Sequence, residues 1–173
     1  MPLTRSTDNN PNPLHPGGIY LLLYIRDTDI AQGFHWALYH HHDGGRGGYK
    51  FNIRNFGGSG WICDSAPAAN IMAGFLLAGA LRIGHCDPGR AGEDLVWIDS
   101  VDLSVAPEPY GVLTCRTWTL GCVRGLVARG VVRCADVDKL EEEAGRWGVA
   151  QHRGAREGEQ PRPVADSVSC MLG

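Results

Sequence analysis

The chain has 173 residues, of which 43% are hydrophobic and 20% are charged, and its formal net charge is −3. This length supports one compact domain with a substantial core and is short for two domains. A mildly acidic chain offers no basic field for phosphate groups, so the charge argues against nucleic acid and anionic membranes as partners.

The N-terminal segment is polar and rich in proline and asparagine. We expect residues 1–17 to form a flexible arm and residues 18–173 to form the single domain. No positively charged start followed by an apolar run marks an export signal, and the longest apolar stretch, residues 71–81, is short for a membrane span. The six cysteines include no CxxC pair, and together with the missing export signal this favours reduced thiols in a cytoplasmic protein. We also expect no membrane partner.

Two segments near the start of the domain are typical of strands. Residues 19–25, IYLLLYI, form a continuous apolar run bounded by glycine and polar residues, which predicts a fully buried central strand. Residues 34–56 alternate between apolar and polar on both sides of a glycine-rich turn, HDGGRGG, which predicts a β-hairpin.

The hairpin brings two polar side chains of interest near each other. Because side chains alternate along a strand, His35 points away from the bulky face that Phe34 and Trp36 share. With the turn centred near residues 44–46, residues close to Asn52 and Asn55 lie opposite residues near His35, although more than one register fits. Asn52 is therefore a candidate neighbour of His35.

The middle of the chain gives weaker signals. Residues 68–83 favour a helix with Asn70 as its N-cap, although two internal glycines disfavour it. Residues 95–103, LVWIDSVDL, predict a strand, and residues 164–172 predict a last strand at the C-terminus.

Two helices are predicted in the last third of the chain. After a proline-rich break, apolar residues at helical spacing predict a helix that begins near Thr114 or Cys115 and is closed by Gly130. Asp136 is placed to cap a second helix, which we expect to end before a polar loop over residues 151–163. The predicted fold class is therefore α+β, with an antiparallel sheet packed against the helix that bears Cys115.

Two cysteines lie seven residues apart in the first of these helices. Cys115 occupies the first turn, where unpaired backbone N–H groups and the helix dipole stabilise a thiolate. Cys122 falls on the apolar stripe with Trp118 and Leu126, which indicates a small buried hydrophobic residue.

A nucleophilic cysteine needs a base to take its proton and a third group to orient that base. Cys115 as nucleophile, His35 as general base and acid, and Asn52 as the orienting group would meet this requirement. The same residues also fit a protein without turnover, in which His35 is a core or interface histidine and Asn52 an ordinary polar residue. Such a protein would be a binding or scaffold module, in one version self-associating.

Three short motifs carry a resemblance to a known family. The order of HWALY on a strand, a polar residue on the next strand and CRTW opening a helix resembles the circularly permuted, papain-like branch of the NlpC/P60 superfamily. Lecithin:retinol acyltransferase-like proteins of that branch carry a similar HW-x-x-Y strand. The resemblance spans roughly residues 18–170, and a group of small fungal proteins shares further motifs. The matching positions are His35–Trp36, Asn52, Cys115–Trp118, Arg129–Gly130 and Arg162–Pro163.

The resemblance implies a papain-like fold and a cysteine-dependent hydrolase or acyltransferase. Such an enzyme would act on an amide, ester or thioester of a small molecule or peptide, with Cys115, His35 and Asn52 in the site and no cofactor. Thr114 stands where the acyltransferases usually have asparagine, and their C-terminal membrane anchor has no counterpart here. A retinoid or phospholipid substrate is therefore not carried over.

A histidine cluster and a glycine-rich stretch suggest other chemistry. The cluster at His40, His41 and His42 lacks the close ligand pairs typical of zinc sites, so we expect no metal. Residues 56–60, FGGSG, match neither a phosphate-binding loop nor a nucleophile elbow.

Overall fold

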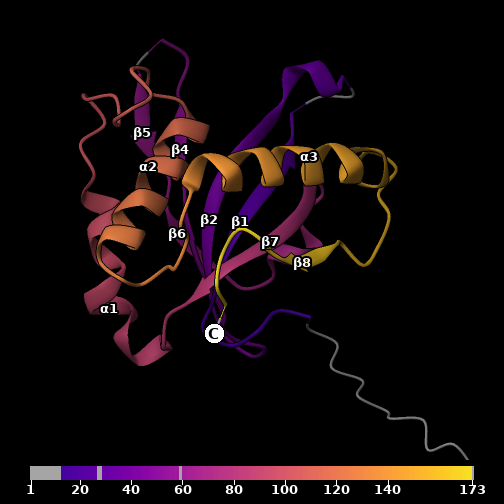
Figure 1. Cartoon of the computed structure of the whole chain (residues 1–173). Helices are drawn as coiled ribbons and strands as arrows, with labels where there is room; N and C mark the ends of the chain where they lie inside the picture. The colour runs from indigo at the N-terminus through magenta and orange to yellow at the C-terminus, as the bar shows by residue number, and fades with distance from the viewer. Residues whose placement is uncertain (1–12, 27–28, 59, 173) are drawn as a thin grey trace, which may run out of the picture.

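A six-stranded sheet forms the centre of the computed structural model, which describes residues 13–26, 29–58 and 60–172 (Figure 1). The strand order is β6-β3-β2-β1-β7-β8, and all neighbours are antiparallel except β7 and β8; β4 and β5 pair separately. The strands are β1 (Gly18–Ile25), β2 (Phe34–Asp43), β3 (Gly47–Phe51), β4 (Ile53–Asn55), β5 (Trp61–Cys63), β6 (Ala66–Ala68), β7 (Leu77–His85) and β8 (Val164–Asp166).

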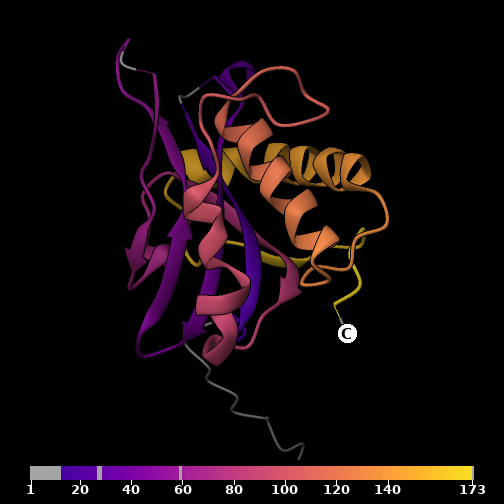
Figure 2. The same ribbon diagram turned by 90° about the vertical axis from the view of Figure 1, so that its left-hand side faces the viewer.

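Two long helices, α2 (Cys115–Ala128) and α3 (Val137–Arg156), cover one face of this sheet (Figure 2). The apolar side chains of that face, among them Leu21, Leu23 and Trp36, form one core with the helices. A smaller core lies on the opposite face. The fold class predicted from the sequence, α+β, is confirmed. The short helical elements are η1 (Ile30–Gln32), η2 (Ile71–Ala73), η3 (Pro88–Arg90), α1 (Ala91–Asp94) and η4 (Val96–Ser100).

The central strand and the hairpin follow the sequence pattern. β1 lies in the middle of the sheet, and seven of its eight residues are buried. β2 and β3 pair from Asp43 opposite Gly47 to Leu38 opposite Phe51. Beyond Phe51 the chain leaves this pairing and β4 pairs with β5 instead, so Asn52 lies at the point where the hairpin opens.

The helix predicted over residues 68–83 is wrong. Only η2 is helical there, the Asn70 side chain makes no capping hydrogen bond, and most of the segment is strand β7. β7 is buried on both faces between β1 and β8, so its sequence lacks the alternation that identifies a half-exposed strand. A side chain at Gly79 would collide with the Trp147 ring, so this glycine serves close packing in the sheet.

The strand predicted over residues 95–103 is also wrong. Residues 96–100 form the 3₁₀ helix η4 instead; its N-cap Leu95 and Ile98 are buried, while Val96 is exposed. Residues three apart share a face of a 3₁₀ helix, and this spacing accounts for the burial.

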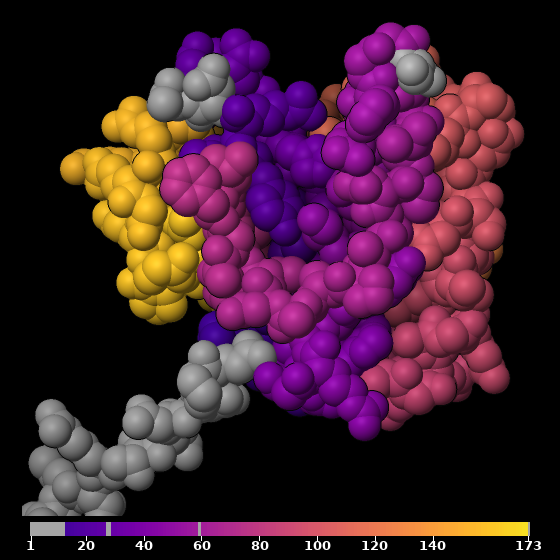
Figure 3. Space-filling model, turned by 180° about the vertical axis from the view of Figure 1, so that it is seen from behind, coloured from indigo at the N-terminus to yellow at the C-terminus, as the bar shows by residue number. Residues whose placement is uncertain are grey.

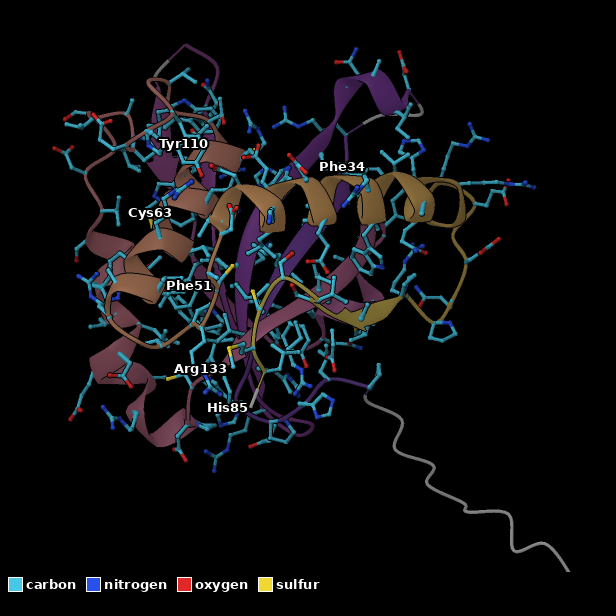
Figure 4. All side chains as sticks on the ribbon, in the orientation of Figure 1. Phe34, Phe51, Cys63, His85, Tyr110 and Arg133 are labelled. Carbon is cyan, nitrogen blue, oxygen red and sulfur yellow. The ribbon has the colours of Figure 1, made fainter. Side chains whose placement is uncertain are left out.

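Two further boundaries differ from the sequence prediction. α3 continues to Arg156, into the predicted loop, because His152 and Ala155 extend its buried stripe. His152 packs edge-on against the Phe34 ring, which lies beside α3 (Figure 4). The last strand covers only β8 and not all of residues 164–172.

The predicted N-terminal arm falls partly outside the described residues, which begin at residue 13. Its described part, residues 13–17, packs on the sheet: Leu14 is buried, and the Gly17 N–H donates a hydrogen bond to the His41 carbonyl. None of the helices within the described ranges has the length and apolar character needed to cross a bilayer.

Substitutions at two glycines of α3 can test how closely this helix packs on the sheet. A Cβ atom at Gly148 would lie 2.7 Å from Cδ1 of the buried Leu23 and 3.0 Å from the Phe34 ring, whereas nothing lies within 4 Å at Gly145. A helical Gly→Ala change normally stabilises by about 1 kcal/mol, but overpacking costs about 1–3 kcal/mol. We expect Gly145→Ala to raise the free energy of unfolding by about 1 kcal/mol and Gly148→Ala to lower it by about 1 kcal/mol in urea denaturation. Equal gains in both variants would contradict the packing.

Candidate active site

Cys115 is the first residue of α2, as the sequence predicted. Thr114 caps the helix: its side-chain oxygen accepts a hydrogen bond from the Thr117 N–H at 3.1 Å, and its own N–H donates to the Thr117 hydroxyl at 2.8 Å. This reciprocal capping box fixes where the helix begins. It therefore places the Cys115 sulfur in the first turn, at the positive end of the helix dipole.

Three groups from other elements surround the Cys115 sulfur. The Arg26 guanidinium, just after β1, donates a hydrogen bond from Nη2 to Sγ at 3.0 Å. Burial disfavours the thiolate, but hydrogen bonds from the His35 side chain and the Trp36 backbone N–H, with the charges of His35 and Arg26, outweigh it. Together they lower the pKa of the Cys115 thiol to about 7. About half of this thiol is therefore ionised at neutral pH.

Cys122 lies in the opposite environment, two turns further along the helix. Its side chain is buried in the core between α2 and the sheet, and this burial raises the pKa of its thiol far above the usual range. The prediction that Cys122 is a small buried hydrophobic residue is confirmed. All six cysteines of the chain are free thiols, and Cys63 is the exposed one.

The His35 imidazole is held by Asn52. His35 Nε2 lies 2.5 Å from Asn52 Oδ1, and the Asn52 amide nitrogen points to Asp64 Oδ2 at 3.4 Å. This arrangement makes Oδ1 the acceptor, so Nε2 carries the proton that His35 donates to Asn52. The other ring nitrogen, Nδ1, remains available to exchange a proton with Cys115.

Asn52 is itself fixed by the segment that follows β5. Its backbone N–H donates to the Ser65 hydroxyl at 3.1 Å, and its carbonyl accepts from the Asp64 N–H at 2.8 Å. The Asn52 residue is 4% exposed. Because hydrogen bonds hold both the backbone and the side chain of Asn52, little conformational entropy is lost when it orients the His35 imidazole.

Two adjoining cavities give access to these residues. A cavity of about 710 Å³ is lined by Cys115, by Trp36 and by the first turns of α3. A second cavity, of about 530 Å³, is lined by His35 and Asn52. Arg26 and Gln32 line both cavities, so the two adjoin beside the cysteine–histidine pair.

The structure thus brings together all three residues that the sequence singled out, Cys115, His35 and Asn52. Sequence reasoning missed Arg26 and Gln32, which the β1–β2 connection carries to the same place. The signal for Arg26 was a cation directly after a buried strand. This position points to the site only when the pairing of β1 with β2 is known, because Tyr24 then lies opposite His35.

Arg26 supplies a prediction of its own. Because its guanidinium donates to the sulfur, Arg26→Met is expected to raise the pKa of Cys115. The shift should be smaller than that caused by loss of His35, because the hydrogen bond and the charge of His35 each lower this pKa more than the charge of Arg26 does. The pH dependence of Cys115 alkylation measures it, with Arg153→Met as a control on an exposed arginine that pairs with Glu157 and lines neither cavity. An unchanged midpoint in Arg26→Met would show that the guanidinium does not act on the thiolate.

Fold and site together define a mixed α+β domain with a cysteine, a histidine and an asparagine linked by hydrogen bonds. Within the described ranges, no three His, Cys, Asp or Glu side chains are grouped so as to hold a metal ion. No protein-family model, curated protein or solved structure matches the chain.

Proposed function

We propose that the chain is a cysteine-dependent acyl-transfer enzyme, a hydrolase or acyltransferase that acts on an amide, ester or thioester. Cys115 is the nucleophile, His35 the general base and acid, and Asn52 the group that orients His35. The observation that carries the proposal is the surroundings of the Cys115 sulfur, where His35, Arg26 and a backbone N–H all favour the thiolate. Activation of a thiol in this way is characteristic of catalytic cysteines.

In the first half of the reaction, the Cys115 thiolate attacks the carbonyl carbon of the acyl donor. A carbon–sulfur bond forms, and the carbonyl oxygen takes the negative charge, which the N–H groups at the start of α2 stabilise. The bond to the leaving group then breaks as protonated His35 donates its proton to that group. The acyl group remains on Cys115 as a thioester.

In the second half, water or an amine attacks this thioester. His35 accepts the proton of the attacking molecule, and the acyl group leaves the sulfur, which restores the thiolate and protonated His35. Water gives a hydrolase and a second substrate gives an acyltransferase. The cycle uses no cofactor, and its substrate is a small molecule or peptide.

The order of the site residues along the chain supports the same assignment. The histidine precedes the cysteine, as in the permuted papain-like branch of the NlpC/P60 superfamily that the HW and CRxW motifs resemble. Membership of that branch is part of the proposal.

Intact-protein mass spectrometry tests the function. We expect one acyl group to be added when the protein is exposed to a panel of thioester, ester and amide donors, and peptide mapping to place it on Cys115. The accessible Cys63 serves as the internal comparison. Failure of every donor to acylate Cys115 faster than Cys63 would overturn the proposal and favour a binding or scaffold module without turnover.

A further inference from the structure

The cavity beside His35 lies on the sheet face that α2 and α3 leave uncovered. Figure 3 shows this face hollowed between the segment that leads into β7 and the β4–β5 hairpin. Among the described residues, eight line the cavity, and they include two cations and no carboxylate. The lining residues are Tyr24, Ile25, Arg26, Gln32, His35, Lys50, Asn52 and Leu76.

Lys50 is the cation that the reaction itself does not use. It lies on β3 opposite Tyr39, and its Nζ atom is 5.4 Å from the centre of the Tyr24 ring. This cation–π contact holds the ammonium group at the cavity wall. Burial raises the pKa of Tyr24 to about 12, so the ring beneath Lys50 stays neutral.

The charge of Lys50 is not balanced by the side chains described around it. No ion pair joins Lys50 to a carboxylate of the described residues. Asp64, which contacts Asn52, is paired with Arg54 and does not line the cavity. The cavity therefore presents a positive charge to whatever enters it.

The cavity beside Cys115 has a different character. Three carboxylates of α3, those of Asp138, Glu141 and Glu142, line it. Arg116 pairs with Glu141 and Arg124 pairs with Asp138. In this cavity the three carboxylates face the cations Arg26 and Arg116, whereas the described side chains around the cavity beyond the imidazole supply cations without a carboxylate.

The position of His35 decides which part of a substrate meets the cation. The imidazole protonates the leaving group, so the leaving group lies on the His35 side of the scissile bond and enters the cavity that His35 lines. We propose that the leaving group of the acyl donor carries an anionic group that Lys50 binds. This inference rests on the proposed function and adds to it the charge of the substrate.

Three butyryl thioesters with different leaving groups test the inference. Their thiols are 3-mercaptopropionate, which is anionic, 2-mercaptoethanol, which is neutral, and thiocholine, which is cationic. We expect kcat/KM, followed as loss of thioester absorbance, to be about fivefold higher for the anionic than for the neutral leaving group, and lowest for thiocholine. High salt should reduce the preference.

Variants of the two lysines of the chain make the test specific. Lys50→Met should bring the ratio of anionic to neutral rates close to one, and Lys50→Glu should reverse the preference in favour of thiocholine. The matched control is Lys139→Met, which changes an exposed lysine of α3 that lines neither cavity and should keep the wild-type ratio.

The outcomes separate this inference from the proposed function. If all three thioesters acylate Cys115 at equal rates, or if Lys50→Met keeps the anionic preference, the charge assignment is wrong and the acyl-transfer function stands. If none of the three acylates Cys115 while another donor of the thioester, ester and amide panel does, the charge assignment is wrong. If no donor of that panel acylates Cys115 faster than Cys63, both are overturned.

Discussion

Cys115→Ser is expected to abolish acylation of the protein by every donor that labels the wild-type chain. The serine hydroxyl has nearly the same size but does not ionise near neutral pH, so it lacks the anionic nucleophile that the site stabilises. Intact-protein mass spectrometry with a butyryl thioester should show one added acyl group on the wild-type protein and none on the variant. Because this variant loses the proposed catalytic nucleophile, we expect it to show the largest effect.

The matched control replaces an exposed cysteine. Cys63→Ser removes the thiol that solvent reaches most easily, and it should leave acylation at its wild-type rate. Circular dichroism melting curves of both variants check that the fold is intact. Acylation that persists in Cys115→Ser and disappears in Cys63→Ser would assign the reactivity to simple exposure.

His35→Ala is expected to give the second largest effect. Loss of a general acid–base group typically slows a reaction about 10²- to 10⁴-fold, and we expect the acylation rate of Cys115 at pH 7 to fall within this range. The same change removes a hydrogen bond and a charge that lower the pKa of Cys115, so that pKa should rise toward its ordinary value. The rate should therefore recover partly as the pH is raised from 7 to 9.

A second histidine provides the control for this experiment. His85 pairs with Gly18 at the start of β1, whereas His35 pairs with Tyr24 near its end, so the two lie at opposite ends of that strand. His85→Ala should keep the wild-type rate and pH profile. If His35→Ala retains both as well, His35 has no role in the chemistry.

The parts of the fold that follow a simple periodicity could be predicted from the sequence. The continuous apolar run of β1, the glycine-rich turn between β2 and β3, and the capped start of α2 each have a local signature. The α+β class follows from these elements. The burial of Cys122 follows from its place on the apolar stripe of α2.

The failures lie where tertiary contacts override local pattern. β7 is buried on both faces. Its two glycines disfavour a strand as much as a helix, but the Trp147 ring packs against Gly79 and Val132 packs against Gly84. The end of α3 looked like a loop because its residues are polar, yet the contact of His152 with Phe34 holds it as helix. These contacts join residues that are far apart in the sequence, so a local sequence pattern does not predict them.

The same distinction applies to the candidate site. Cys115, His35 and Asn52 could be singled out because each sits at a recognisable position, the start of a helix or one strand of a hairpin. Arg26 and Lys50 could not, because their importance depends on which strands are neighbours in the sheet and where the cavities open.

The most direct test of the account is the pH dependence of iodoacetamide labelling, resolved by peptide mass spectrometry for each cysteine. The structure predicts a midpoint near pH 7 for Cys115, while burial raises the pKa of Cys86 to about 11 and of Cys170 to about 12. At pH 6, Cys115 should hold about 100-fold more thiolate than an unperturbed thiol with a pKa near 9. Slow, uniform labelling of all six thiols, or a Cys115 midpoint near pH 9, would contradict an activated cysteine.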